Sequence, residues 1–224
     1  TENEFKVTLR RFFSNNGFAV SDIPNVPDDE RADFSLDDGS SRILLELKIK
    51  GDDSDETQTR SGILETGEVY QRSESSLRRN RISALIKKAA SQLQKTPLEA
   101  DFRVVWFHCA GRYGQNHETR SVATLYGRRM LIHTEKKVKD CVGYYFDNSD
   151  FFAFRDTLSA CVVSWSGRCQ LCINDLHKRA DLFRKSNFRK LFDDGYIDPA
   201  EFEQRGEAYI IDGDVDRTNE QSVL

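Results

Sequence analysis

The chain contains 224 residues, of which 38% are hydrophobic and 31% are charged, and its formal net charge is −4. This length suits one domain with or without an appendage, and the acidic balance excludes the strongly basic surface of a nonspecific nucleic-acid coat. No apolar run reaches the length of a membrane span, the start shows no signal-peptide pattern, and the five cysteines form an odd set. These features predict a cytoplasmic protein in a reducing compartment, with no membrane partner.

The first predicted element is a helix over residues 2–15, which ends at the stop signal Asn16-Gly17. Its apolar residues recur at helical spacing. They are Phe5, Leu9, Phe12 and Phe13. A short first strand is expected at residues 18–20.

Residues 32–36 and 43–49 form the most informative pattern in the chain, because apolar and polar residues alternate there at the period of a strand. Asp38-Gly39 between them is a strong signal for a hairpin turn. A two-residue turn would place Asp33 diagonal to Glu46, whereas a four-residue loop over residues 38–41 would place the two directly opposite each other. Both loop lengths bring Asp33, Glu46 and Lys48 to one face of the hairpin.

Two neighbouring carboxylates and an ammonium group make this face a candidate catalytic site. The carboxylates of Asp33 and Glu46 repel each other, and a divalent cation between them would remove that penalty. Mg²⁺ or Mn²⁺ suits such hard oxygen ligands. The simpler alternative is a half-solvated hairpin with ordinary surface charges.

Residues 51–76 are rich in Gly, Asp, Ser, Thr and Glu, and they predict a long loop insertion, either a flap over the substrate or a solvated excursion. A helix over residues 77–94 follows, based on the spacing of Ile82, Ile86 and Leu93. Its polar side is basic and suits contacts with phosphates, with a solvated helix face as the alternative. The candidate nucleic-acid-binding residues are Arg78, Arg79, Arg81, Lys87 and Lys88.

The second half of the chain predicts further strands and then helices. The strands are expected at residues 102–108, near 129–133 and 142–146, and at 160–165 and 169–173, with a polar loop at residues 111–120. A helix is expected over residues 176–192 and a short one from Asp198-Pro199. The tail from about residue 212 is polar and is expected to be loose.

The cysteines raise the question of a zinc site. Cys169 and Cys172 have C-x-x-C spacing, with Cys161 before them and His177 after them. Both lie in an expected strand, however, where positions three apart point to opposite faces. Small core thiols are therefore the preferred interpretation, and zinc is not expected.

Asp33, Glu46 and Lys48, with the hairpin that carries them, resemble the motif of the PD-(D/E)XK nuclease superfamily. The resemblance implies a restriction-endonuclease-like core, an α/β fold in which helices flank a central mixed sheet. It implies a nuclease-like domain over residues 1–174, which includes the 51–76 insertion, and a helical C-terminal extension over 175–224 that is not an independent domain. One departure is Ala32, which stands where the family motif has proline.

The resemblance also implies roles for individual residues. Asp33, Glu46 and the backbone carbonyl of Leu47 would hold the metal ion, and Lys48 would orient or deprotonate the attacking water or stabilise developing charge. Two further helices would contribute side chains to the same site. These side chains are Gln92 and Lys88, which would position the phosphate or the water, and Glu4, a further metal ligand.

The resulting hypothesis is a Mg²⁺-dependent nuclease, specifically a DNA endonuclease, with RNA as the alternative substrate. A homodimer or a larger complex fits this hypothesis, because cutting a duplex favours a dimer and an acidic chain would gain nucleic-acid affinity from a partner. The alternative from a different class is a catalytically inactive nuclease-fold scaffold or a nucleic-acid-binding module of a larger complex.

Overall fold

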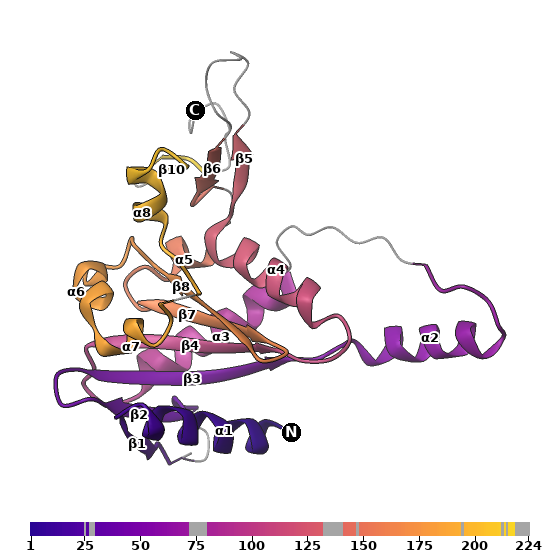
Figure 1. Ribbon diagram of the computed structural model, residues 1–224, viewed down its shortest axis with the longest axis horizontal. Coiled ribbons are helices and arrows are strands. Elements are labelled where there is room, and N and C mark those ends of the chain that lie inside the picture. Colours follow the sequence, from indigo (N-terminus) through magenta and orange to yellow (C-terminus); the bar gives the residue numbers. More distant parts are fainter. Residues whose placement is uncertain are drawn as a thin grey trace.

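The chain folds as an α/β protein in which helices flank a central mixed sheet (Figure 1). The computed structural model describes residues 1–24, 26, 30–71, 80–131, 141–146, 148–193, 195–211, 213 and 215–217. Two of the candidate nucleic-acid-binding residues, Arg78 and Arg79, lie outside these ranges, as do most of the tail and residues 132–133 of an expected strand.

The main sheet has seven strands in the described residues, in the order β1-β2-β3-β4-β7-β8-β9. β1 to β3 form an antiparallel meander, β4 and β7 continue it in parallel, β8 is antiparallel to β7, and β9 is parallel to β8. The strands are β1 (Ala19–Asp22), β2 (Phe34–Asp37), β3 (Arg42–Lys50), β4 (Phe102–Cys109), β7 (Ala160–Trp165), β8 (Arg168–Ile173) and β9 (Tyr196–Ile197).

A smaller sheet lies apart from the main one, near the top of Figure 1. In the described residues it has the order β10-β6-β5, with β6 parallel to β10 and antiparallel to β5. Its strands are β5 (Arg129–Leu131), β6 (Cys141–Tyr144) and β10 (Ala208–Ile210). The described helices are α1 (Glu2–Asn15), α2 (Ser54–Glu65), α3 (Asn80–Lys95), α4 (Gly114–Tyr126), α5 (Asp150–Ala153), α6 (Ala180–Lys185), α7 (Asn187–Lys190) and α8 (Pro199–Gln204).

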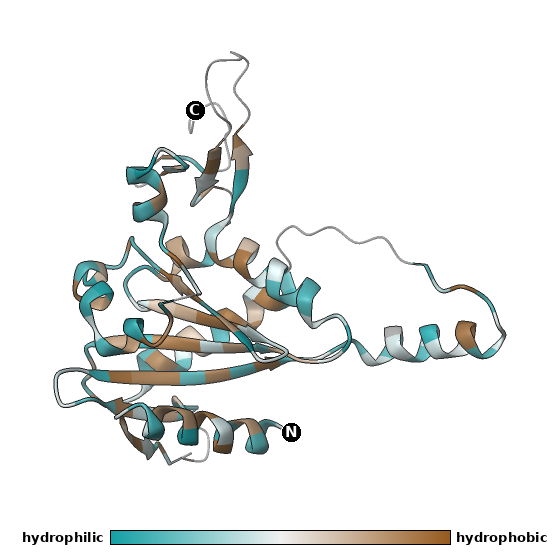
Figure 2. Ribbon diagram, in the orientation of Figure 1, coloured by the Kyte–Doolittle hydropathy of each residue, from teal (hydrophilic) through white to brown (hydrophobic). Residues whose placement is uncertain are grey.

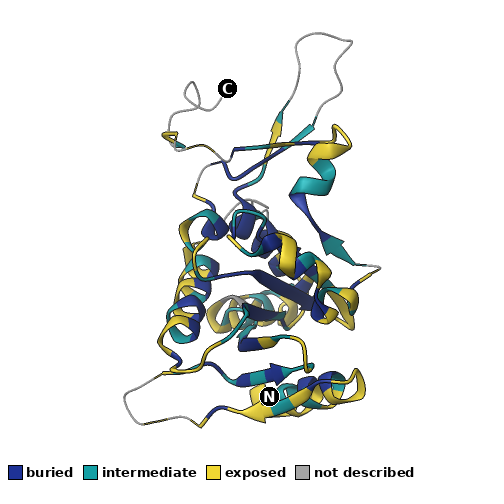
Figure 3. Ribbon diagram, turned by 90° about the vertical axis from the view of Figure 1, so that its left-hand side faces the viewer, coloured by how far each residue is buried: buried dark blue, intermediate teal, exposed yellow. Residues whose placement is uncertain are grey.

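The two faces of the main sheet carry two separate hydrophobic cores. Successive residues of β3 alternate between them, because side chains along a strand point to opposite faces: Leu44 packs with α3, whereas Leu45 and Leu47 pack with α1. β3 is accordingly hydrophobic along most of its length in Figure 2, and the central strands are buried in Figure 3. The sheet is thus covered on both faces, and polar side chains within it need a specific reason to be there.

The β2–β3 hairpin adopts the longer of the two registers considered above. Asp37 pairs with Arg42 and Phe34 pairs with Leu45, so that the loop spans residues 38–41. Asp38 closes this loop by accepting hydrogen bonds from the backbone of Ser40 and Ser41 at 2.9 and 2.7 Å. This register continues to a position at which Asp33 lies opposite Glu46.

Several expected elements are confirmed, including α1, β3, α3, β4, β7, β8 and the start of α8, where Asp198 caps the helix. The loop expected at residues 51–76 is wrong in its first half, because α2 occupies Ser54–Glu65 and extends away from the sheets (Figure 1). The loop expected at 111–120 is also wrong, because α4 begins at Gly114. α2 lacks the apolar stripe that reveals a helix in a sequence, and α4 carries its buried apolar residues only from Val122 onward.

The segment after residue 174 is not purely helical. Its expected helix over 176–192 is divided into α6 and α7, because Ser186 has an extended backbone and caps the second helix. β9 and β10 then join the main and the small sheet, respectively. None of the described helices is both long and apolar enough to cross a membrane.

Candidate active site

The candidate site lies where β3 extends beyond the start of β2. β2 pairs only with Arg42–Leu45, whereas β3 remains paired with β4 up to Lys50. The backbone of Leu47 therefore has no strand partner on the β2 side, and its N–H donates to Asp33 Oδ2 at 2.8 Å. Because the N–H and C=O of a strand residue point to the same edge, the Leu47 carbonyl also faces the Asp33 side. Asp33 and this carbonyl, two of the predicted ligands, thus share one edge.

Glu46 is a buried carboxylate with one unsatisfied oxygen. The residue is 2% exposed, its Oε1 accepts a hydrogen bond from Lys48, and its Oε2 is buried with no hydrogen-bond partner among the described residues. Burial raises the pKa of Glu46, the neighbouring charge of Asp33 raises it further, and Lys48 compensates only in part, so that the pKa reaches about 8. A hydrogen bond between the carboxyl groups of Glu46 and Asp33 also raises this pKa, and a cation held by both carboxylates would replace the proton that they share.

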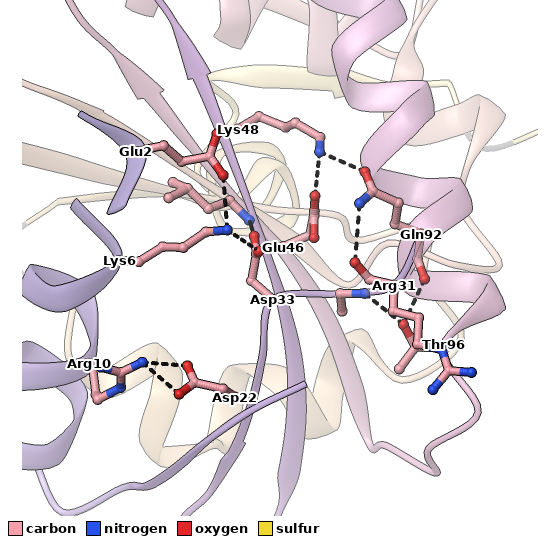
Figure 4. Close-up of polar contacts among 12 residues, drawn as sticks. Glu2, Lys6, Arg10, Asp22, Arg31, Asp33, Glu46, Lys48, Gln92 and Thr96 are labelled. Carbon is pink, nitrogen blue, oxygen red and sulfur yellow. Dashed lines mark hydrogen bonds and ion pairs between the residues drawn. The ribbon is translucent and has the colours of Figure 1, made fainter. Parts of the chain in front are cut away.

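Lys48 and Gln92 are brought to the same point from two different elements. Lys48 Nζ donates to Glu46 and to Gln92 Oε1, the latter at 2.6 Å. The amide of Gln92 on α3 in turn donates to the backbone carbonyl of Arg31 at 3.1 Å. Gln92 therefore ties the lysine to the segment that precedes Asp33 (Figure 4). The structure thus brings together four of the residues expected at the site: Asp33, Glu46, Lys48 and Gln92.

Lys6 is a site residue that the sequence analysis missed. It extends from α1, and its Nζ lies 2.6 Å from Asp33 Oδ1 and 2.9 Å from Glu2 Oε1. Burial alone would lower the pKa of Lys6, but the hydrogen bonds to Asp33 and Glu2 outweigh it and raise the pKa. Figure 4 shows Asp33 between Lys6 on one side and Glu46 on the other. The sequence showed only a Glu2–Lys6 pair one helical turn apart, with nothing to place it against the hairpin.

Thr96 is a second residue that the sequence analysis missed. Its hydroxyl accepts a hydrogen bond from the backbone N–H of Ala32 at 2.8 Å and donates to the backbone carbonyl of Gln92, also at 2.8 Å. The side chain is buried. The sequence contains one pattern that includes it, since Lys88, Gln92 and Thr96 are polar residues at intervals of four along α3 and directly after it.

Glu4, the expected ligand from the first helix, is not brought to the acid pair. It lies at the third position of α1, where its backbone N–H donates to the Thr1 side chain and its carboxylate accepts from the Thr1 nitrogen in a capping box. Residues two apart on a helix point to widely different directions. Glu2, rather than Glu4, therefore lies on the side of α1 near Asp33, and both carboxylates contact Lys6.

The candidate nucleic-acid-binding residues that the structure describes lie along the exposed side of α3. Lys88, one turn before Gln92, forms an ion pair with Glu30 at 2.6 Å, and both are about half exposed. Lys87 is exposed to solvent, and Arg81 pairs with Asp53, the cap residue of α2. Lys88 is thus at the rim of the site, while Arg81 anchors the start of α2.

A second polar concavity lies at the opposite end of β3, around the loop of the hairpin and residues 99–103. Two of the arginines that line it contact acidic side chains: Arg42 pairs with Asp37 at 3.2 Å and Arg179 with Asp101 at 2.8 Å. It does not include the acid pair, and both of its aspartates are already paired with arginines. We therefore regard it as a surface feature rather than a competing site.

The donor set at Asp33 and Glu46 fits a hard divalent cation. Mg²⁺ commonly uses one or two carboxylates and keeps several waters, so the two carboxylates and the Leu47 carbonyl suffice. No group of three or more His, Cys, Asp or Glu side chains that could hold a metal occurs in the described part of the chain. The five cysteines are free thiols, and Cys169 is exposed whereas Cys172 is buried.

Comparison with known proteins identifies no relative of this chain. No protein-family model matches the sequence, no curated protein matches it, and no solved structure matches it. The function of the site must therefore be inferred from its own geometry and chemistry.

Proposed function

We propose that this chain is a metal-dependent nuclease with a restriction-endonuclease-like core, acting as a DNA endonuclease. The observation that carries the proposal is the convergence of Asp33, Glu46, Lys48 and Gln92 at one point, with Glu46 Oε2 buried and unsatisfied. An ordinary surface hairpin would leave its charges in solvent rather than bury a carboxylate. The buried, unsatisfied acid favours a catalytic site over a solvated strand.

The order of the elements supports the same proposal. The sequence resemblance implies a helix, a three-stranded meander, a second helix and a further strand. α1, the β1–β2–β3 meander, α3 and β4 follow this order, with α2 inserted after β3. The motif residues lie directly before β2 and along β3, and α3 lies beside them, which agrees with the arrangement that the resemblance implies.

In the proposed reaction, Asp33, Glu46 and the Leu47 carbonyl would hold Mg²⁺ or Mn²⁺, and the ion would supply Lewis-acid polarisation of the scissile phosphate. Lys48 orients the attacking water and stabilises the charge that develops on the phosphate. Gln92 fixes the ammonium of Lys48 by its hydrogen bond and by its link to Arg31. Lys88 at the rim contacts the nucleic-acid backbone, as an exposed lysine beside an active site can.

The net charge of the chain bears on how it would bind nucleic acid and on whether it would act alone. With a net charge of −4, the described basic rim is local, and affinity for DNA would come in part from a second copy or from a larger complex. RNA is the alternative substrate, because binding through the phosphate backbone does not distinguish the two.

A cleavage panel tests this function. Supercoiled plasmid, linear duplex DNA, single-stranded DNA and RNA are each incubated with the protein in Mg²⁺, Mn²⁺ or EDTA, beside the Asp33→Ala variant. We expect cleavage of DNA with either metal, none in EDTA, and none by the variant. Binding of nucleic acid without cleavage under all conditions would instead indicate the inactive scaffold or binding module, and equal cleavage by Asp33→Ala would place the activity elsewhere.

A further inference from the structure

Lys6 contacts Asp33, one of the two carboxylates that would hold the cation. Asp33 has two carboxylate oxygens with different partners: Oδ2 accepts the N–H of Leu47 at 2.8 Å, and Oδ1 contacts Lys6 Nζ at 2.6 Å. The first contact holds the carboxylate against the edge of β3. The second is made by a side chain that comes from α1, on the other face of the sheet.

Asp33 Oδ1, which contacts Lys6, is the oxygen of this carboxylate that makes no hydrogen bond to the backbone. Oδ2 is already used to satisfy the backbone, so a cation shared between Asp33 and Glu46 would take Oδ1 together with Glu46 Oε2. Glu46 Oε2 has no hydrogen-bond partner among the described residues. Lys6 therefore neutralises the carboxylate that such a cation would use, and the two positive charges compete for Asp33.

We propose that Lys6 is a built-in counter-ion of Asp33 that competes directly with the divalent cation and is displaced when the cation binds. This inference rests on the proposed function and adds to it a positioning residue that weakens the affinity for the metal. In the metal-free protein each acid of the pair has its own lysine, Lys6 for Asp33 and Lys48 for Glu46. The pocket is thereby kept folded without a metal.

Glu2 lowers the cost of this displacement. Lys6 Nζ also contacts Glu2 Oε1 at 2.9 Å, and Glu2 is about half exposed one helical turn earlier. When Lys6 leaves Asp33 it keeps this second carboxylate and can turn toward solvent at the rim. The ammonium is then free to contact a phosphate next to the cation.

The same helix provides a matched control. Arg10, one turn after Lys6, forms an ion pair with Asp22 at 2.5 and 2.7 Å that is more exposed than the Lys6–Asp33 pair. This pair is a similar tie between α1 and the edge of the sheet, but it lacks any contact with the acid pair (Figure 4). Its removal changes the charge of α1 by the same amount without freeing an oxygen of Asp33.

Calorimetric titration with Mg²⁺ and Mn²⁺ tests the inference on the wild type, Lys6→Met, Lys6→Arg and Arg10→Met. We expect Lys6→Met to bind each metal about three- to tenfold more tightly, the effect of removing a partly buried ion pair. Lys6→Arg and Arg10→Met should stay close to the wild type. Thermal unfolding in EDTA confirms that each variant is folded, and Lys6→Gln replaces Lys6→Met if that variant is not.

Two outcomes separate this inference from the proposed function. If the wild type binds metal and Lys6→Met binds it with equal or lower affinity, the competition is excluded while the nuclease proposal stands. If neither protein binds metal, both are overturned.

A measurement on the unaltered protein checks the same point. Lysine labelling by reductive methylation, followed by mass spectrometry, reports how accessible each ammonium group is. Lys6 should react faster in Mg²⁺ than in EDTA, whereas Lys190, a distant lysine that contacts Asn187 at 3.0 Å, should be unchanged. Equal labelling of Lys6 with and without the metal would show that it is not displaced.

Discussion

Glu46 is the residue of the candidate site whose pKa is shifted most strongly by its surroundings. It is 2% exposed, and burial together with Asp33 raises its pKa from 4.5 to about 8. A group with a raised pKa in the folded state stabilises the fold below its unfolded pKa and loses that contribution as the pH rises through the folded pKa. For Glu46 in the metal-free protein, the window of this loss runs from about pH 4.5 to about pH 8.

This shift predicts the effect of removing the charge. The free energy of unfolding of Glu46→Gln, relative to the wild type, should rise by a few kcal/mol between pH 5 and pH 9, since each pKa unit corresponds to about 1.4 kcal/mol. Urea unfolding in EDTA at pH 5, 7 and 9 measures the difference. Glu30→Gln, which removes a half-exposed acid paired with Lys88, is the control. A difference between Glu46→Gln and the wild type that does not vary with pH would contradict the account.

The sequence predicts those residues of the candidate site that lie in the alternating pattern of the β2–β3 hairpin. The period of two placed Asp33, Glu46 and Lys48 on one face without knowledge of the register, whereas Gln92 was implied only by the family resemblance. Lys6 could not be found in this way, because its position beside Asp33 depends on how α1 packs against the sheet. The expectation that Glu4 is a ligand is wrong for the same reason. The rotation of α1 about its axis decides which glutamate faces Asp33, and this rotation depends on tertiary packing.

At the scale of elements, α3 is held to the active hairpin by polar contacts in addition to its apolar face. Gln92 contacts the carbonyl of Arg31, and Thr96 contacts the N–H of Ala32. These two contacts fix the backbone directly before Asp33. The helix therefore orients Lys48 and restrains the chain that carries the first carboxylate.

Thr96→Val tests this role because it preserves shape and removes the hydroxyl. The buried N–H of Ala32 would lose its acceptor, so we expect the free energy of unfolding to fall by about 1–3 kcal/mol. The midpoint of urea unfolding, with an unchanged slope, measures the loss. Thr96→Ser retains the hydroxyl and should lose less. Equal stability of Thr96→Val and the wild type would show that the contact contributes nothing.

The helices and strands that could not be predicted from the sequence share one property, which is the absence of a clear apolar pattern. α4 buries polar residues, among them His117, Ser121 and Thr124, so its inward face does not read as apolar. α2 extends from the body and has no apolar stripe. β9 and β10 are two and three residues long, too short for any alternation, and they form only because a sheet edge is present to pair with them.

At the scale of the molecule, two cores on opposite faces of one sheet create the site at their boundary. α1 closes one face and α3 closes the other, and the acid pair lies at the edge of β3 that neither core fills. Lys6 reaches this edge from the first helix and Gln92 from the second. The alternation in residues 43–49 is the pattern of a strand with one buried face, whereas Ile43 to Leu47 are all buried. Both the burial of the second face and the meeting of the two helices at one edge therefore required the structure.

The nuclease assignment is tested most directly by comparing the cleavage of a labelled DNA duplex in Mg²⁺ by the wild type, Lys48→Ala and Lys190→Ala. The account predicts that Lys48→Ala folds normally and cleaves at least about 100-fold more slowly, the loss typical of a removed acid–base or charge-stabilising group. Lys190→Ala, altered on distant α7, should cleave at the wild-type rate. Cleavage by folded Lys48→Ala at the wild-type rate would contradict the account, because it would remove this lysine from the reaction.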